Sequence, residues 1–171
     1  MKKRTSYIKR RRTPQKKVRK LKQAYTPPAW FMALPLGSHG NTPAQKRAWK
    51  AISQLVRRTD FEKYGGKCVS CPAILDSWQE GHCGHYKAWS VCHGFFKLEK
   101  SNLSLQCPRC NYLSDGPVGH AFGKELERRY GKGHLQWIDE ENERHRGEKM
   151  ETWQLVELVR KLRPDLVYGD D

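Results

Sequence analysis

Hydrophobic residues recur at helical spacing in several stretches of the chain. Thr42-Pro43 is a typical N-cap and first-turn pair, and the apolar positions 49, 52, 55 and 56 share one face of a helix expected to run to about Arg58. Gly65-Gly66 ends this region. The same spacing predicts helices over 118–130, 135–144 and 152–162. Pro108 predicts the start of another, shorter helix.

Two segments between these helices favour β-strands. Residues 82–89 and 95–98 are predicted to pair as a hairpin with a long connection. The segment that precedes them, after Cys71 and up to Gln79, fits either a loop or an irregular strand. Helices grouped around one small sheet indicate an α+β fold.

Residues 25–41 mix prolines with bulky apolar side chains, so we expect a strap or linker without a regular element. Trp30, Phe31 and Leu34 are expected to pack on the domain surface. The longest apolar run, 29–36, contains a proline and is far too short to cross a bilayer, and no secretory signal is recognised. These features predict a soluble, cytoplasmic protein without a membrane partner.

Positive charge is concentrated at the start of the chain. The 171 residues carry a net charge of +15, but residues 1–22 hold 12 of the 33 Lys and Arg and no acidic residue, which leaves +3 for the other 149. The length favours one domain. We interpret residues 1–24 as a disordered basic arm that binds nucleic acid. Its candidate phosphate contacts are Arg10, Arg11, Arg12, Lys16 and Lys17. A solubilising tail, or an anchor to a ribosome or membrane surface, is the alternative.

Two CxxC pairs frame the centre of the chain. Cys68 and Cys71 form the first pair, Cys107 and Cys110 form the second, and 35 residues separate them. In a reducing compartment such pairs indicate a metal site and not disulfides, and four thiolates make a closed tetrahedral site for a structural zinc ion. We call these four residues the cysteine clasp. Without metal, the loop between the pairs is expected to lose its shape.

A histidine and two asparagines lie within or directly after the cysteine clasp. Phosphodiester hydrolysis needs a base to activate water and a cation to stabilise charge, and histidine is the natural base near neutral pH. In a ββα-metal core of the HNH or His-Me finger type, His85 would lie on the first strand and Asn102 would orient it. Asn111 would hold a catalytic divalent metal from the start of a helix. A packed, structural His85 is the alternative.

From residue 61 to about residue 165 the chain resembles the phage NinG family, also called Rap. The resemblance rests on Cys68-Val-Ser-Cys71, Trp78, Gly84-His85-Tyr86, Asn102, Gln106 to Asn111, Gly116, Leu126 to Gly131 and Arg144-His145-Arg146. It implies an HNH-type recombination endonuclease that acts on branched DNA such as Holliday junctions and D-loops. It also implies that His85 is the base, Asn102 its orienting partner and Asn111 a ligand of the catalytic metal.

The chain departs from the family pattern at His82, where the family tends to place an acidic residue three positions before the base. Imidazole also binds metal ions, so His82 is a second candidate ligand, and the catalytic ion is expected to be Mg²⁺, Mn²⁺ or a softer ion. His82 could instead join Cys83, Cys92 and His93 in a second zinc site. We prefer to interpret both cysteines as small buried side chains.

Other residues near the site could either contact DNA or have an ordinary structural role. Lys87 and Arg109 are candidate phosphate contacts, which Lys124, Arg128 and Arg129 would extend unless these are ordinary helix surface. Trp89, Phe95 and Phe96 could stack on unpaired bases, although core packing is the preferred interpretation.

We therefore expect a zinc-clasped ββα-metal core, 68–111, inside a helix-wrapped domain of residues 42–166. The expected activity is metal-dependent endonucleolytic cleavage of branched DNA, in the cytoplasm of a bacterial host. Two symmetric cuts in a junction suggest a homodimer on DNA, and phage recombination proteins are further expected partners. The rival interpretations are a sequence-reading HNH homing or restriction nuclease, and a zinc protein that binds nucleic acid without cutting it.

Overall fold

The computed structural model describes residues 25–113 and 116–166. Its helices are α1 (Ala29–Ala33), α2 (Pro43–Tyr64), α3 (Pro108–Leu113), α4 (Pro117–Tyr130), α5 (His134–Arg144) and α6 (Thr152–Leu162). The strands β1 (His82–His85) and β2 (Leu103–Gln106) form a small antiparallel sheet, and short 3-10 helices cover Gly94–Leu98, Lys100–Asn102 and Pro164–Leu166. The described part is thus helix-rich with a two-stranded sheet. The arm candidates Arg10, Arg11, Arg12, Lys16 and Lys17 lie outside the described residues.

Helix α2 begins as predicted and ends later than predicted. The Thr42 hydroxyl accepts a hydrogen bond from the Gln45 amide, and the Gln45 side chain accepts one from the Thr42 amide, which is a complete capping box. The helix continues past Arg58 to Tyr64, because the first residue that favours termination is Gly65, whose left-handed backbone (φ 61°) caps the helix.

The second strand of the hairpin was predicted in the wrong place. Residues Gly94–Leu98 form a 3-10 helix, whose apolar Phe96 and Leu98 are buried in the core. The actual partner of β1 is Leu103–Gln106, and the register pairs His82 with Gln106 and His85 with Leu103. The sequence Leu103-Ser104-Leu105-Gln106 alternates apolar and polar residues as a half-exposed strand would, but every residue of β2 is buried.

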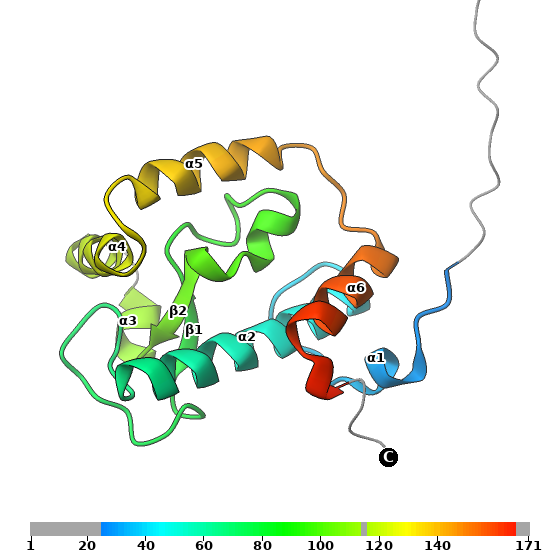
Figure 1. Cartoon of the computed structure of the whole chain (residues 1–171), viewed down its shortest axis with the longest axis horizontal. Coiled ribbons are helices and arrows are strands. Elements are labelled where there is room, and N and C mark those ends of the chain that lie inside the picture. The colour runs from blue at the N-terminus through cyan, green and yellow to red at the C-terminus, as the bar shows by residue number, and fades with distance from the viewer. Residues whose placement is uncertain (1–24, 114–115, 167–171) are drawn as a thin grey trace, which may run out of the picture.

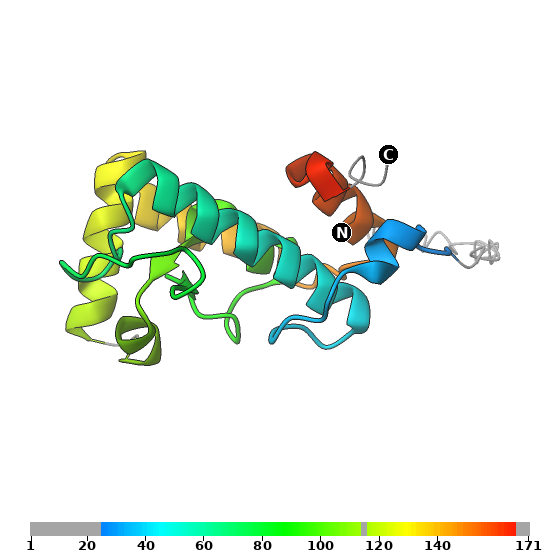
Figure 2. The same cartoon turned by 90° about the horizontal axis from the view of Figure 1, so that it is seen from below.

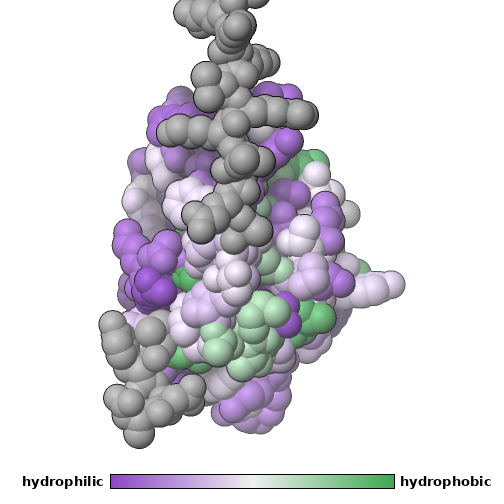
Figure 3. All heavy atoms as spheres, turned by 90° about the vertical axis from the view of Figure 1, so that its right-hand side faces the viewer, coloured by the Kyte–Doolittle hydropathy of each residue, from purple (hydrophilic) through white to green (hydrophobic). Residues whose placement is uncertain are grey.

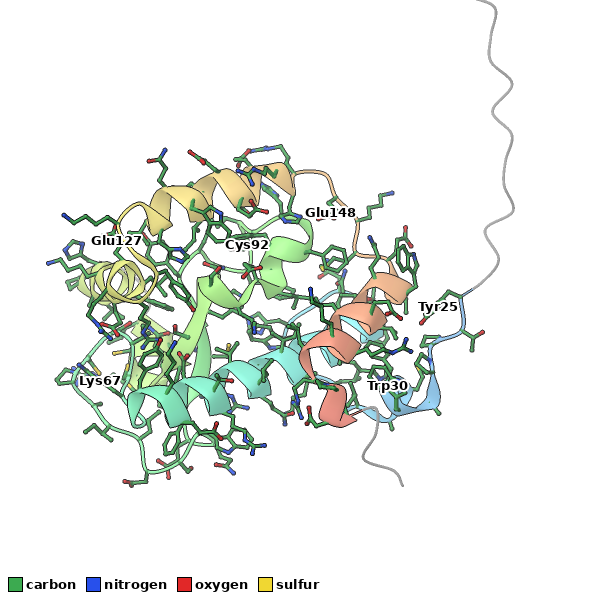
Figure 4. The ribbon with its side chains drawn as sticks, viewed as in Figure 1. Tyr25, Trp30, Lys67, Cys92, Glu127 and Glu148 are labelled. Carbon is green, nitrogen blue, oxygen red and sulfur yellow. The ribbon has the colours of Figure 1, made fainter. Side chains whose placement is uncertain are left out.

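The hairpin lies in the interior between two groups of helices. Figure 1 shows α2 along one side with α6 beside it, and α5 along the opposite side next to α4. One core cluster joins α1, α2 and α6 to Leu98 and Leu103. The second joins Phe122, Leu126 and Ile138 of α4 and α5 to Val69, Cys92 and Phe96. Figure 4 shows the side chains that fill both spaces, with Cys92 in the interior below α5.

The strap is more ordered than the sequence indicates. Residues 29–33 form the short helix α1, and Phe31 is completely buried against α2 and α6, with Trp30 and Leu34 packed around it. The remainder of the strap runs beside the first turns of α2 (Figure 2), where the Gly37 amide donates to the Lys46 carbonyl. On the end face formed by α1 and α6, hydrophobic and polar residues are interspersed (Figure 3). Among the described residues, no helix has the length and apolar character that crossing a membrane requires.

A buried ion pair ties α2 to α4 and to the hairpin. The Asp60 carboxylate accepts hydrogen bonds from the Leu105 amide (2.9 Å) and from Arg129 (3.0 Å). Arg129 is only 3% exposed, and it also donates to Ser104 and Glu125 and lies 3.7 Å from the centre of the Tyr64 ring. Arg129 is therefore a structural residue and not part of an exposed basic track.

Replacing Asp60 by Ala is expected to lower the free energy of unfolding by about 3 kcal/mol, because Arg129 loses a buried counter-charge. The matched control is Glu62→Ala on the same helix, which removes an exposed pair with Arg58 and should cost less than about 1 kcal/mol. Urea unfolding of both variants at pH 7 measures the difference. Equal losses of unfolding free energy in the two variants would show that the buried pair stabilises the fold no more than the exposed pair does.

Candidate active site and metal centre

The cysteine clasp brings together the chain before and after the hairpin. The sulfur atoms of Cys68, Cys71, Cys107 and Cys110 all lie within 4.8 Å of one another. Cys68 lies in the turn that follows α2, and Cys107 lies between β2 and α3. The clasp therefore fixes the position of α3 relative to the two strands.

The four sulfur atoms fit a zinc ion. Tetrahedral bonds of about 2.3 Å require sulfur atoms about 3.8 Å apart, and the Cys71 and Cys107 sulfur atoms are 3.8 Å apart. Backbone amides of Ser70 and Cys107 donate to the Cys68 sulfur, and the Cys110 amide donates to the Cys107 sulfur. Such donors stabilise thiolate charge. The clasp is accordingly a candidate structural metal site, with zinc as the best-fitting ion.

The remaining cysteines lie apart from the clasp. The Cys92 thiol donates to the Lys87 carbonyl, is buried against Phe96, and burial raises its pKa to about 11. Cys83 lies on β1, and burial raises the pKa of its thiol. Among the described residues, the clasp is the group of His, Cys, Asp and Glu that could hold a metal ion. His93 instead lies 3.9 Å from Glu143.

His85 lies at the end of β1 inside a cluster of aromatic rings. Its ring stacks on Trp49 with 4.8 Å between centroids and an interplanar angle of 21°, and it meets the edge of Trp89 at 5.7 Å. His39 of the strap completes the cluster, 5.8 Å from His85 and in contact with both tryptophans. Three rings from three separate segments therefore surround the candidate base.

The environment of His85 fixes its protonation state. Burial lowers the pKa of the imidazole to about 4, although its hydrogen bond to the Lys97 carbonyl acts in the opposite direction. The Nε2 atom is 3.1 Å from that carbonyl oxygen. Because a carbonyl only accepts, Nε2 must carry the proton, so Nδ1 of the neutral ring holds the free lone pair. His85 has the electronic form that a general base needs at neutral pH.

Asn102 positions the backbone that follows His85 and not the ring. Its fully buried side chain accepts from the Lys87 amide (2.8 Å), and donates to the Lys87 carbonyl (3.1 Å) and to the Cys92 sulfur (3.6 Å). The expected direct contact with the imidazole is replaced by the Lys97 carbonyl. The physical reason is that the Asn102 amide pairs with both backbone polar groups of Lys87 across the loop.

Asn111 and His82 are neighbours. Asn111 lies on α3, and its side-chain Nδ2 is 3.1 Å from Nδ1 of His82 at the start of β1. Both side chains line a cleft of about 300 Å³, which also reaches Cys83 on the same strand as His85. Trp49 and His39, the ring partners of His85, line the same cleft. The two predicted metal ligands thus line the cleft directly, whereas the predicted base adjoins it through His39 and Trp49, which contact its ring.

The predicted phosphate contacts have different surroundings. Lys87 forms an ion pair with Asp139, and its side chain is 24% exposed. Arg109 is exposed on α3. Phe96 is buried in the core, and Trp89 belongs to the ring cluster around His85, so both pack as preferred.

Sequence reasoning missed His39, Trp49 and Arg57 as residues of the site. Arg57 reaches across from α2 to the carbonyls of Trp78, Gln79 and Gly81, and so holds the turn that leads into β1. The polar residues of the strap and the basic residues of α2 could have been named as candidates. The sequence around them does not indicate that these segments contact β1.

The clasp predicts one zinc ion per chain after purification. Cys71→Ser should lower the zinc content and the helical circular dichroism signal together, because metal binding and folding share free energy. Cys83→Ala is the matched control and should retain one zinc ion. Elemental analysis of the purified proteins decides the point, and two zinc ions in the wild type would contradict this assignment.

Comparison with curated proteins and with solved structures found no match in either set. The family model described as "Bacteriophage Lambda NinG protein" matches residues 1–163. Because the match covers nearly all of the 171 residues, the protein belongs to the NinG family.

Proposed function

We propose that this protein is a metal-dependent DNA endonuclease that cleaves branched recombination intermediates such as Holliday junctions. Membership of the NinG family suggests a role related to phage recombination. The observation that carries the proposal is the state of His85, a neutral imidazole with Nε2 held by the Lys97 carbonyl. Its ring partners His39 and Trp49 line a cleft that lacks carboxylates.

In the proposed reaction, His85 accepts a proton from water through Nδ1 as the water attacks phosphorus in line. The bond to the 3′ oxygen then breaks and that oxygen takes a proton from solvent, which leaves a 5′-phosphate and a 3′-hydroxyl. Asn102 supports this step by fixing the chain at Lys87, two residues after the base. The hydrogen bond to the Lys97 carbonyl holds the tautomer, because its loss would allow the proton to move to Nδ1.

Asn111 and His82 are the residues that would hold the catalytic divalent ion, whose chemistry is stabilisation of negative charge on the leaving oxygen. A carboxamide and an imidazole are neutral ligands. They favour a borderline ion such as Mn²⁺ more than a carboxylate pair would, although Mg²⁺ remains within the proposal. Exposure of His82 and partial exposure of Asn111 leave the pair open to solvent.

Binding of DNA is proposed to involve charge more than sequence. The basic residues of the first 22 positions supply affinity that falls with salt concentration. Two cuts placed symmetrically in a four-way junction would need two copies of the chain, so the proposal includes a homodimer on DNA. A sequence-reading nuclease would instead cut linear duplex at defined positions.

His85→Ala is expected to lower the rate of junction cleavage by at least about 100-fold, the usual contribution of a general base. Junction binding should remain within about twofold of wild type. Single-turnover cleavage of a labelled four-way junction, with Mg²⁺ and Mn²⁺ tested separately, measures the first quantity, and fluorescence anisotropy measures the second.

The control for this experiment is His120→Ala, which removes an exposed histidine of α4. It should cleave like wild type. If zinc-loaded wild-type protein cuts no DNA with either ion but still binds junctions, the chain is a non-catalytic binding protein.

The low pKa of His85 also predicts the pH dependence of cleavage. A base with a pKa of about 4 is still about 90% unprotonated at pH 5, whereas an ordinary histidine would be about 3% unprotonated. The value of kcat/KM should therefore change less than about twofold between pH 7 and pH 5 and fall near pH 4. Zinc content measured at each pH controls for loss of the clasp, and a saturating concentration of Mn²⁺ controls for competition between protons and metal at His82. An acid limb near pH 6.5 under these conditions would contradict the assignment.

A further inference from the structure

One wall of the cleft comes from outside the hairpin and α3. Residues 36–39 of the strap and the first half of α2 form this wall, opposite His82, Cys83 and Asn111. Figure 2 shows the strap running into α2 along the side of the helix. None of the residues that carry the resemblance lies in this segment, and the proposed function assigns no DNA contact to its side chains.

The lining of the cleft suits an anion. Its side chains include Lys50, Arg57, two histidines and two serines, and no aspartate or glutamate. The Arg57 guanidinium is engaged with four backbone carbonyls. Lys50 has no ion-pair partner among the described residues, since the acidic side chains there pair elsewhere or lie outside the cleft. Its charge is therefore available to a ligand in the cleft.

His39 is held at the boundary between this cleft and the ring cluster. Its Nδ1 lies 2.8 Å from the Ser38 hydroxyl, and its ring contacts Trp49, Trp89 and His85. When the Ser38 hydroxyl donates to Nδ1, the proton of the neutral ring lies on Nε2. His39 then presents an N–H donor beside the candidate base. The surrounding rings restrict its rotation, so the donor is positioned before a ligand arrives.

We propose that His39 and Lys50 bind a backbone phosphate of DNA in this cleft, next to the candidate base His85. Lys50 supplies the charge and His39 supplies an oriented hydrogen bond to a non-bridging oxygen. This assignment rests on the proposed function, because it takes the cleft as the place where a DNA strand passes His85. It adds a phosphate site formed by the strap and α2 to a catalytic centre formed by the hairpin and α3.

The two residues differ in charge, which makes the proposal testable by binding alone. Neutralising one phosphate contact reduces the slope of log Kd against log salt by about 0.9. Lys50→Ala should produce this change and weaken junction binding about threefold to tenfold at 0.1 M salt. His39→Phe keeps an aromatic ring against Trp49 and Trp89 but removes both nitrogen atoms. It should weaken binding about tenfold at 0.1 M salt with the slope unchanged, because the donor is neutral.

The experiment uses the full zinc-loaded chain and a labelled four-way junction in Ca²⁺, with anisotropy measured from 0.05 to 0.3 M salt. Lys63→Ala, which removes an exposed charge near the other end of α2, is the control for loss of one positive charge. Melting temperatures within a few degrees of wild type establish that each variant folds. A change of slope for Lys50→Ala that exceeds the Lys63→Ala change supports the proposal, and so does the weaker binding of His39→Phe.

Lys50→Ala and Lys63→Ala with equal slopes, or His39→Phe with wild-type affinity, would overturn the assignment, as would absence of junction binding by the wild type. Cleavage measured in parallel with Mn²⁺ keeps the two ideas separate. A wild type that binds without cutting contradicts the proposed nuclease, while the Lys50 and His39 results still decide whether the cleft takes a phosphate.

Discussion

The structure depends on the cysteine clasp, because the two strands and α3 are too small to form a stable unit by themselves. A two-stranded sheet of four-residue strands is marginal in water. The clasp joins the turn before the hairpin to the turn after it, and so closes a loop whose interior holds both strands, the 3-10 segments and the ring of His85. The buried Asp60–Arg129 pair then attaches β2 to α2 and α4. The candidate metal site, the ion pair and the helices thus stabilise a sheet that would be marginal by itself.

Burial of His85 produces a useful chemical state and also restricts access. The tryptophan rings exclude water, which lowers the pKa and keeps the imidazole neutral. The same rings cover part of its surface, and the Lys97 carbonyl occupies Nε2. A solvated histidine would be easier to reach but would be partly protonated at pH 6 to 7. On the proposed function, the arrangement favours a base that is unprotonated near neutral pH over one that is fully exposed.

The sequence predicts the helices well and the sheet poorly. Helix α6 covers Thr152–Leu162 as expected, because Leu155, Val156 and Val159 recur on one buried face. Strand β2 was not predicted because Ser104 and Gln106 are typical surface residues. In the structure both are buried, and their side chains form hydrogen bonds with Arg129 and Ser70. The CxxC spacing identified the clasp. The hydrogen bond between His85 and the Lys97 carbonyl could not be predicted, because every residue has a backbone carbonyl and the sequence does not show which one is used. His39 and Trp49 were missed because their contacts with His85 join residues more than 35 positions apart.

The position of the cleft constrains how a DNA strand could approach the site. The free nitrogen of His85 is Nδ1. The candidate metal ligands at the start of β1 and on α3 line the hollow under the strap, and so do His39 and Trp49, which contact the His85 ring. On the proposed function, a phosphate that reaches the candidate metal ligands enters this hollow. It would then meet Lys50 and His39 before it meets an acidic side chain. The strap is therefore better understood as one wall of the site than as a linker to the basic arm, because its removal would expose the ring cluster and change the environment of the base.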